Sequence, residues 1–175
     1  MLVPFEKNHL LKLDLSGFYL SSFINDTLKF EENITGLMIL IADDLTGYLL
    51  FSNGSPLFFK CLANNSGNEW PQEYGCEILF SLKSVDIYVN TIKDHGMFNA
   101  LNLFFNSPTA FMVSSETSDI KRMTGIISAQ KESGVLGFKN GAILNLATVK
   151  NGIPESLYFY LPDKKRYASE KDPSI

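Results

Sequence analysis

The chain has 175 residues, of which 45% are hydrophobic and 13% aromatic, and this composition excludes a largely disordered protein. Its formal net charge of −4 disfavours binding to nucleic acid or anionic lipid, because clustered Lys and Arg supply that affinity. The apolar runs are too short to span a membrane, and the first residues lack the pattern of a signal peptide. We therefore expect a folded cytoplasmic protein with no nucleic-acid partner and no membrane insertion.

The first half of the chain begins with a predicted helix. Its apolar residues recur at the spacing of one helical face, namely Leu20, Phe23, Ile24 and Leu28. We expect this helix to end near Phe30, where the polar connection Glu31-Glu32-Asn33 begins. Thr35-Gly36 then opens the first strand.

Three strands follow as a predicted antiparallel meander. Residues 37–42 form a dense apolar run, residues 43–47 predict a hairpin loop, and residues 48–52 predict the second strand. Asn53-Gly54 predicts a two-residue turn of type I′, because both residues tolerate a positive φ. We expect the third strand at residues 57–62.

A loop, a helix and a strand complete the first half. Residues 63–72 are rich in Asn, Ser and Gly, and they predict an exposed loop that includes Trp70. Residues 73–83 carry apolar side chains at helical spacing, and residues 86–92 alternate as a strand does. Lys93-Asp94-His95-Gly96 breaks this strand, so we place the boundary between the two halves there.

The second half also contains helices followed by a meander. Residues 97–105 predict a helix, residues 111–113 a short strand, and Ser118 the N-cap of a helix that runs toward Lys131. The three strands of the second meander are predicted at residues 135–138, 142–149 and 156–161. The charged residues after Pro162, with the basic cluster Lys164-Lys165-Arg166, predict a flexible tail.

One pattern occurs twice in the chain. Thr35-Gly36 precedes Asn53-Gly54-Ser55-Pro56, and Ser133-Gly134 precedes Asn151-Gly152-Ile153-Pro154 at the same spacing, 98 residues later. The residues shared are turn residues, so the pattern indicates either an internal duplication or two meanders with convergent turns. The equal spacing favours duplication. The predicted fold class is α+β, with two antiparallel β-meanders and amphipathic helices packed on one face.

Residues 14–92 resemble a known family. The helix, Thr35-Gly36, the apolar hairpin, residues 47–54 and the later Gly75-Cys76-Glu77-Ile78-Leu79 are similar to the PATAN-type domain of bacterial signalling proteins. Family members commonly carry a small residue after the turn and an alanine after Gly-Glu, and this chain departs from both features at Phe58-Phe59-Lys60 and at Cys76. The resemblance implies a non-catalytic module that acts through protein contacts in two-component signalling or surface motility.

Few residues in the chain suggest chemistry. Asp43-Asp44 is an adjacent carboxylate pair that could bind a divalent cation or act in acid–base catalysis, but neighbours at a hairpin tip usually point apart. His95 has no nearby cysteine or patterned aspartate. Cys61 and Cys76 do not form a metal-type pair, and we expect both to be reduced core residues. We expect no cofactor, no metal and no catalytic residue.

Aromatic residues are in surplus. Trp70 lies in a predicted polar loop, either as a lid over the core or as an exposed anchor for a partner. Phe58-Phe59 and Phe104-Phe105 each contain one ring more than a single buried face accommodates. Such rings are most often core, but they also fit a dimer or partner interface. Trp70 and these four phenylalanines are therefore the candidate interface.

These features favour a non-enzymatic protein-interaction module in bacterial signalling or regulation. We expect a PATAN-like module at residues 1–94, a second and repeated module at residues 95–162, and a flexible tail at residues 163–175. The expected partner is another protein or a second copy of the chain. The alternative is a small-ligand sensor or enzyme with a pocket between the halves, lined by Asp43, Asp44 and His95.

Overall fold

The computed structural model describes residues 7–14, 22, 24, 26, 34–64, 69–71, 75, 77, 81, 84–107, 119–141, 143–164 and 166–171. They form two compact units, which divide between Asp94 and His95. We call residues 5–94 the N-terminal unit and residues 95–175 the C-terminal unit. Both units contain an antiparallel sheet, and the chain has an α+β fold.

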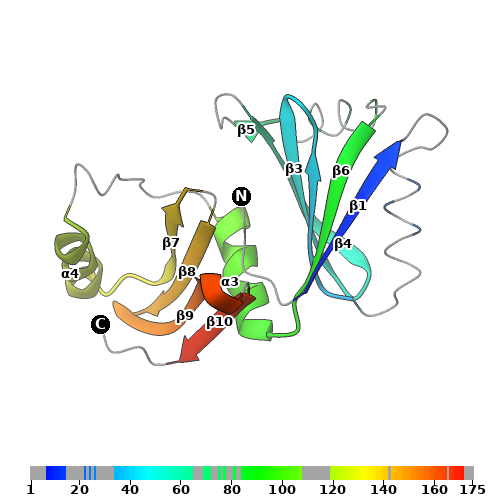
Figure 1. The fold of residues 1–175 in the computed structure, drawn as a ribbon. Coiled ribbons are helices and arrows are strands. Elements are labelled where there is room, and N and C mark those ends of the chain that lie inside the picture. The colour runs from blue at the N-terminus through cyan, green and yellow to red at the C-terminus, as the bar shows by residue number, and fades with distance from the viewer. Residues whose placement is uncertain are drawn as a thin grey trace. The chain divides into compact units, whose positions relative to one another are not determined.

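The sheet of the N-terminal unit has six strands in the order β1-β6-β2-β3-β4-β5 (Figure 1). Neighbouring strands are antiparallel throughout. The strands are β1 (Lys7–Asp14), β2 (Gly36–Ile41), β3 (Leu45–Ser52), β4 (Ser55–Ala63), β5 (Glu69–Trp70) and β6 (Ser84–Thr91). Strands β2, β3 and β4 form the first of the two predicted meanders.

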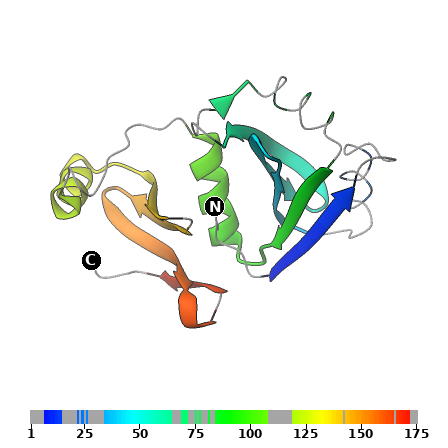
Figure 2. The same cartoon turned by 45° about the horizontal axis from the view of Figure 1, so that its top comes forward.

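The sheet of the C-terminal unit has four strands in the order β10-β9-β8-β7. The strands are β7 (Gly134–Asn140), β8 (Ile143–Lys150), β9 (Ile153–Leu161) and β10 (Arg166–Lys171). The helices are α3 (His95–Asn106), α4 (Ile120–Gln130) and the short 3₁₀ helix η1 (Pro162–Lys164). Helix α3 lies beside β7 and β8 (Figure 2). The second meander confirms the predicted fold class.

The N-terminal core gathers on one face of its sheet. Its buried members are Ile24, Met38, Leu40, Leu45, Leu49, Phe51, Cys61, Val85, Ile87 and Val89. Ser22, Ile24 and Asp26 are helical, so the predicted first helix contributes Ile24 to this core. The other face of β2 is apolar too, because Leu37 and Ile39 are also buried. A strand buried on both faces reads as a continuous apolar run rather than as an alternating one.

The two meanders have the same register. Gly36 lies opposite Phe51 in the β2–β3 pair, and Gly134 lies opposite Val149 in the β7–β8 pair, 98 residues later. A register shift separates Leu50 from Phe51, and its counterpart separates Thr148 from Val149. Each shift is a β-bulge, which inserts an unpaired residue and bends the strand. The repeat therefore includes the irregularity as well as the strand order.

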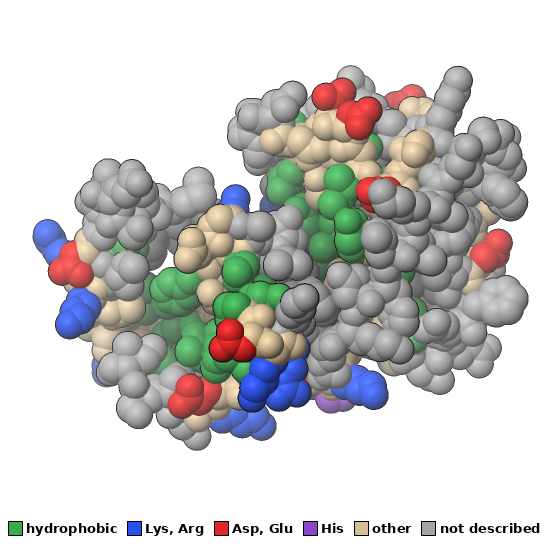
Figure 3. All heavy atoms as spheres, viewed as in Figure 1, with side chains coloured by type: hydrophobic (Ala, Val, Ile, Leu, Met, Phe, Trp, Pro, Cys, Tyr) green, Lys and Arg blue, Asp and Glu red, His purple; other side chains and the backbone are tan. Residues whose placement is uncertain are grey.

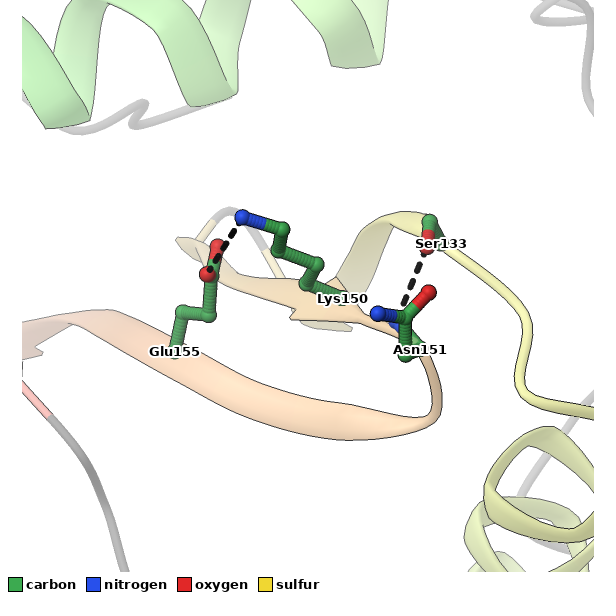
Figure 4. A network of polar contacts seen from close by, with 4 residues as sticks. All are labelled: Ser133, Lys150, Asn151 and Glu155. Atoms are coloured by element: carbon green, nitrogen blue, oxygen red, sulfur yellow. Dashed lines mark hydrogen bonds and ion pairs between the residues drawn. The ribbon is translucent and has the colours of Figure 1, made fainter.

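The two Asn-Gly turns make equivalent hydrogen bonds, and Figure 4 shows the one in the second turn, between Asn151 and Ser133. The N–H of Asn53 donates to Thr35 Oγ1 at 3.1 Å, and the N–H of Asn151 donates to Ser133 Oγ at 2.9 Å. All four residues of the two turns have positive φ, between 48° and 77°, as a type I′ turn requires. Figure 4 also shows Lys150 near Glu155, at 3.8 Å, an exposed ion pair that contributes little.

The repeat extends to a fourth strand, which the sequence did not reveal. Cys61 of β4 lies opposite Trp70 of β5, and Phe159 of β9 lies opposite Ala168 of β10, again 98 residues later. Strand β5 lies within the predicted loop, and β10 lies within the predicted flexible tail. The prediction of a tail is therefore wrong for residues 166–171, because β10 pairs with β9 along its whole length.

Several local boundaries also differ from the predictions. Strand β1 was not predicted at all, and it pairs with β6 along eight residues. The first hairpin loop is shorter than predicted, because β3 begins at Leu45. Asp119 caps α4 by accepting the N–H of Lys121 at 2.9 Å, in place of the predicted Ser118. The predicted strand at residues 111–113 lies outside the described residues.

Candidate functional site

The predicted carboxylate pair lies at the tip of the β2–β3 hairpin. Asp43 and Asp44 are both exposed. The side chain of Asn64 braces this tip, because its Nδ2 donates to the carbonyl oxygens of Ala42 and Asp43 at 2.8 and 3.0 Å. Thr46 Oγ1 donates to Asn64 Oδ1 at 2.6 Å. The hydrogen bonds of Asn64 order the backbone of the turn. The exposure of both carboxylates agrees with the solvated turn that the sequence favoured for this pair.

His95 is the first residue of α3 and is exposed. It belongs to the C-terminal unit, whereas Asp43 and Asp44 belong to the N-terminal unit. Within the described part of the chain, His, Cys, Asp and Glu side chains form no group of three that could hold a metal ion. The pocket that would unite these three residues therefore stays a prediction.

The Phe104-Phe105 pair is placed by α3. Phe105 is buried, with 6% of its surface exposed, and the two rings meet edge to face with centroids 5.5 Å apart. Phe104 packs on Gly137 of β7 so closely that a Cβ atom there would overlap its ring. Gly137 thus allows α3 to approach the sheet. The pair serves the packing of the C-terminal unit, and Phe104 alone retains partial exposure.

The other candidate aromatics lie on β4 and β5. Phe58 and Phe59 are neighbours on β4, so they point to opposite faces of the sheet. Phe59 packs against the N-terminal core, and both rings are half-buried. Trp70 belongs to β5 and pairs with Cys61, which corrects its predicted place in a loop. The side chain of Trp70 lies outside the described residues, as does Cys76, whereas the side chain of Cys61 is fully buried.

An apolar face of the C-terminal sheet was not anticipated from the sequence. Side chains alternate along a strand, so Leu136 and Phe138 point away from the face on which α3 meets Gly137. Leu157 lies on the same face, because the register joins Leu136 to Ala147 and Ala147 to Leu157. Phe159 follows two residues later. All four of these side chains are half-buried. We call these four residues the open face.

The open face differs from its counterpart in the N-terminal unit. The residues 98 positions earlier are Met38, Leu40, Phe59 and Cys61, and all four belong to the N-terminal core or pack against it. Met38, Leu40 and Cys61 have no exposed surface. The same structural repeat is therefore closed on this face in one unit and partly open in the other. The burial of these side chains in the structure reveals this difference, since both segments are comparably apolar in sequence.

The described polar groups buried in the C-terminal unit have partners. Tyr167 of β10 is buried, and its hydroxyl donates to the carbonyl oxygen of Leu144 at 2.9 Å. Its ring lies against Tyr160, with centroids 5.3 Å apart. Burial raises the pKa of the Tyr167 hydroxyl above its usual value. This hydrogen bond anchors β10 to β8 and explains why residues 166–171 form a strand despite their charges.

Comparison of the chain with protein-family models, with curated proteins and with solved structures finds no match. The resemblance to the PATAN-type domain therefore stays a prediction. Among the described residues, no helix is both long enough and apolar enough to cross a membrane.

Proposed function

We propose that the chain is a non-enzymatic protein-interaction module with a role in bacterial signalling or regulation in the cytoplasm. The open face of the C-terminal unit carries this proposal. Half-buried aromatic and aliphatic side chains on a sheet are typical of protein contact surfaces. The resemblance of residues 14–92 to the PATAN-type domain points in the same direction, because that family acts through protein contacts.

The surface of the C-terminal unit has the composition of a contact site. Hydrophobic side chains are visible over its sheet, and charged side chains border them (Figure 3). Interfaces commonly combine an apolar centre with a polar rim. Leu136, Phe138, Leu157 and Phe159 form the centre in this proposal. The exposed residues Asp43, Asp44 and His95 contribute solubility rather than chemistry.

Binding to a purified partner tests the proposal. The wild-type chain is used to capture a partner from an extract of the source cells, and the partner is identified, purified and titrated calorimetrically. We expect Phe138→Ser and Phe159→Ser each to raise the Kd about tenfold or more, because interface aromatics commonly contribute over 1 kcal/mol. Thermal melts of both variants check that they remain folded.

Leu57→Ser is the matched control. Leu57 is 55% exposed on β4 of the N-terminal unit, outside the open face, so its replacement should leave the Kd unchanged. Equal affinity for wild type and both phenylalanine variants would refute the open face as the contact site. A measured turnover that Asp43→Asn abolishes would refute the non-enzymatic role and favour the pocket hypothesis.

A further inference from the structure

The two copies of the repeat differ along one sheet edge. In the N-terminal unit, β6 pairs with the outer edge of β2 along six residues. The equivalent strand of the C-terminal unit is β7, and it is the terminal strand of its sheet among the described residues. The outer edge of β7 therefore presents backbone N–H and C=O groups that are equivalent to those with which β2 binds β6. An uncovered edge of this kind is a template for another strand.

A glycine marks the place where the missing strand would lie. A Cβ atom on Gly36 of β2 would overlap the carbonyl oxygen of Asn90 in β6, so the close approach of β6 requires glycine there. Gly134 of β7 occupies the equivalent position and is one of the few residues that the repeats share. A Cβ atom on Gly134 would meet nothing within 4 Å. The clearance for a neighbouring strand is present, but the described residues do not fill it.

The remaining sheet edges carry features that discourage pairing. Strand β5 has only two residues, and β1 carries Lys7, Lys12 and Asp14. Strand β10 carries Arg166, Glu170 and Lys171. In contrast, β7 has seven residues, no proline and a single charge, Lys139. Short length and edge charges protect proteins from intermolecular pairing, and β7 is longer than β5 and carries fewer charges than β1 or β10.

We propose that β7 pairs with β7 of a second copy, antiparallel and centred on Gly137, to form a continuous eight-stranded sheet. The proposal goes beyond the proposed function, because it uses the edge of β7 rather than the open face and its partner is the chain itself. Antiparallel pairing is the arrangement of β6 on β2. It is also what a two-fold axis perpendicular to a sheet produces, and two-fold dimers are the commonest homo-oligomers.

The hydrogen-bond pattern fixes which groups would pair. The N–H of Ile92 donates to the carbonyl oxygen of Thr35 at 2.8 Å, so odd-numbered residues of β2 face β6. The equivalent outward residues of β7 are Val135, Gly137 and Lys139. Centring on Gly137 joins Gly137 to its own copy and Val135 to Lys139 of the other copy. Every outward group then has a partner, and the two Lys139 side chains are not opposite each other.

Light scattering with size-exclusion chromatography tests this arrangement across a dilution series of the full chain. We expect wild type to dimerise and Gly134→Val to raise the dimer dissociation constant about tenfold or more, because a side chain there blocks the approach of the second strand. The open space around Gly134 lets the monomer accept valine. Lys139→Pro removes an outward N–H from an edge strand and should also weaken the dimer.

Gly125→Ala is the control, because Gly125 lies on α4 with nothing near its Cβ position, and it should leave the dimer unchanged. A wild-type chain that stays monomeric would overturn the dimer proposal, and so would a dimer that persists in both edge variants. Neither result would affect binding of a purified partner to the open face. If changes in the open face leave partner binding unaltered while the edge variants still weaken the dimer, only the proposed function is overturned.

Discussion

Among single residues, two glycines distinguish the effect of backbone strain from the effect of close packing. Gly141 and Gly152 both have positive φ, +56° and +77°. Gly141 has open space around its Cβ position, whereas a Cβ atom on Gly152 would lie 2.6 Å from the carbonyl oxygen of Ser128 in α4. Gly152 thus serves the turn and also lets α4 approach it.

The first prediction compares these two glycines. Gly141→Ala should lower the free energy of unfolding by about 1 kcal/mol, the cost of a left-handed conformation for a residue with a Cβ atom. Gly152→Ala should cost about 2–3 kcal/mol, because steric overlap is added to the same strain. Urea denaturation of both variants measures the difference. Equal losses would show that α4 does not pack against the turn as described.

The second prediction concerns alkaline pH. Burial raises the pKa of Tyr167, so above about pH 10 the unfolded chain loses this proton more readily than the folded chain. The stability contribution is therefore complete below pH 10 and is lost as the pH rises further. Tyr167→Phe should flatten this fall in unfolding free energy, and it should cost about 1 kcal/mol at neutral pH through loss of the bond to Leu144. Parallel curves for both proteins above pH 10 would contradict the assignment.

At the level of elements, a hydroxyl at the start of each meander binds the Asn-Gly turn that joins the second strand of the meander to the third. Thr35 and Ser133 both accept the N–H of a turn asparagine. The third prediction is that Thr35→Val and Ser133→Ala each cost about 1 kcal/mol, the typical net value of one hydrogen bond. Thermal melts measure both losses. A loss in only one variant would mean that the two equivalent hydrogen bonds do not contribute equally to the stability of the fold.

The meanders were predictable because their signals are local. Asn-Gly turns with positive φ and dense apolar runs identify a hairpin within a few residues. Strands β1, β5 and β10 depend on distant partners. The alternation in β10 is interrupted by charge, and the burial of Tyr167 depends on Leu144, 23 residues earlier. No periodicity within six residues reports such a contact.

The candidate site was less predictable for the same reason. The open face exists because Leu136 and Phe138 lack the cover that Met38 and Leu40 have. Sequence shows that all four residues are apolar, but it does not show which of them a neighbouring element covers. Similarly, Gly36 and Gly134 look alike in sequence, and only the position of β6 distinguishes them.

Across the whole chain, one structural repeat occurs in two forms. In the N-terminal unit, β6 covers the outer edge of β2, and the sheet face is buried. In the C-terminal unit, the described residues leave the edge of β7 and the open face available. The central claim is that this availability is used for contact between proteins, first of all between two copies of the chain.

Amide hydrogen exchange of β7, measured by NMR at low and high protein concentration, tests this claim most directly. The N–H groups of Leu136 and Phe138 face β8 and should be protected at both concentrations. Those of Val135, Gly137 and Lys139 face outward and should become protected only at high concentration, and not in Gly134→Val. Rapid exchange of these three amides at every concentration would contradict the account.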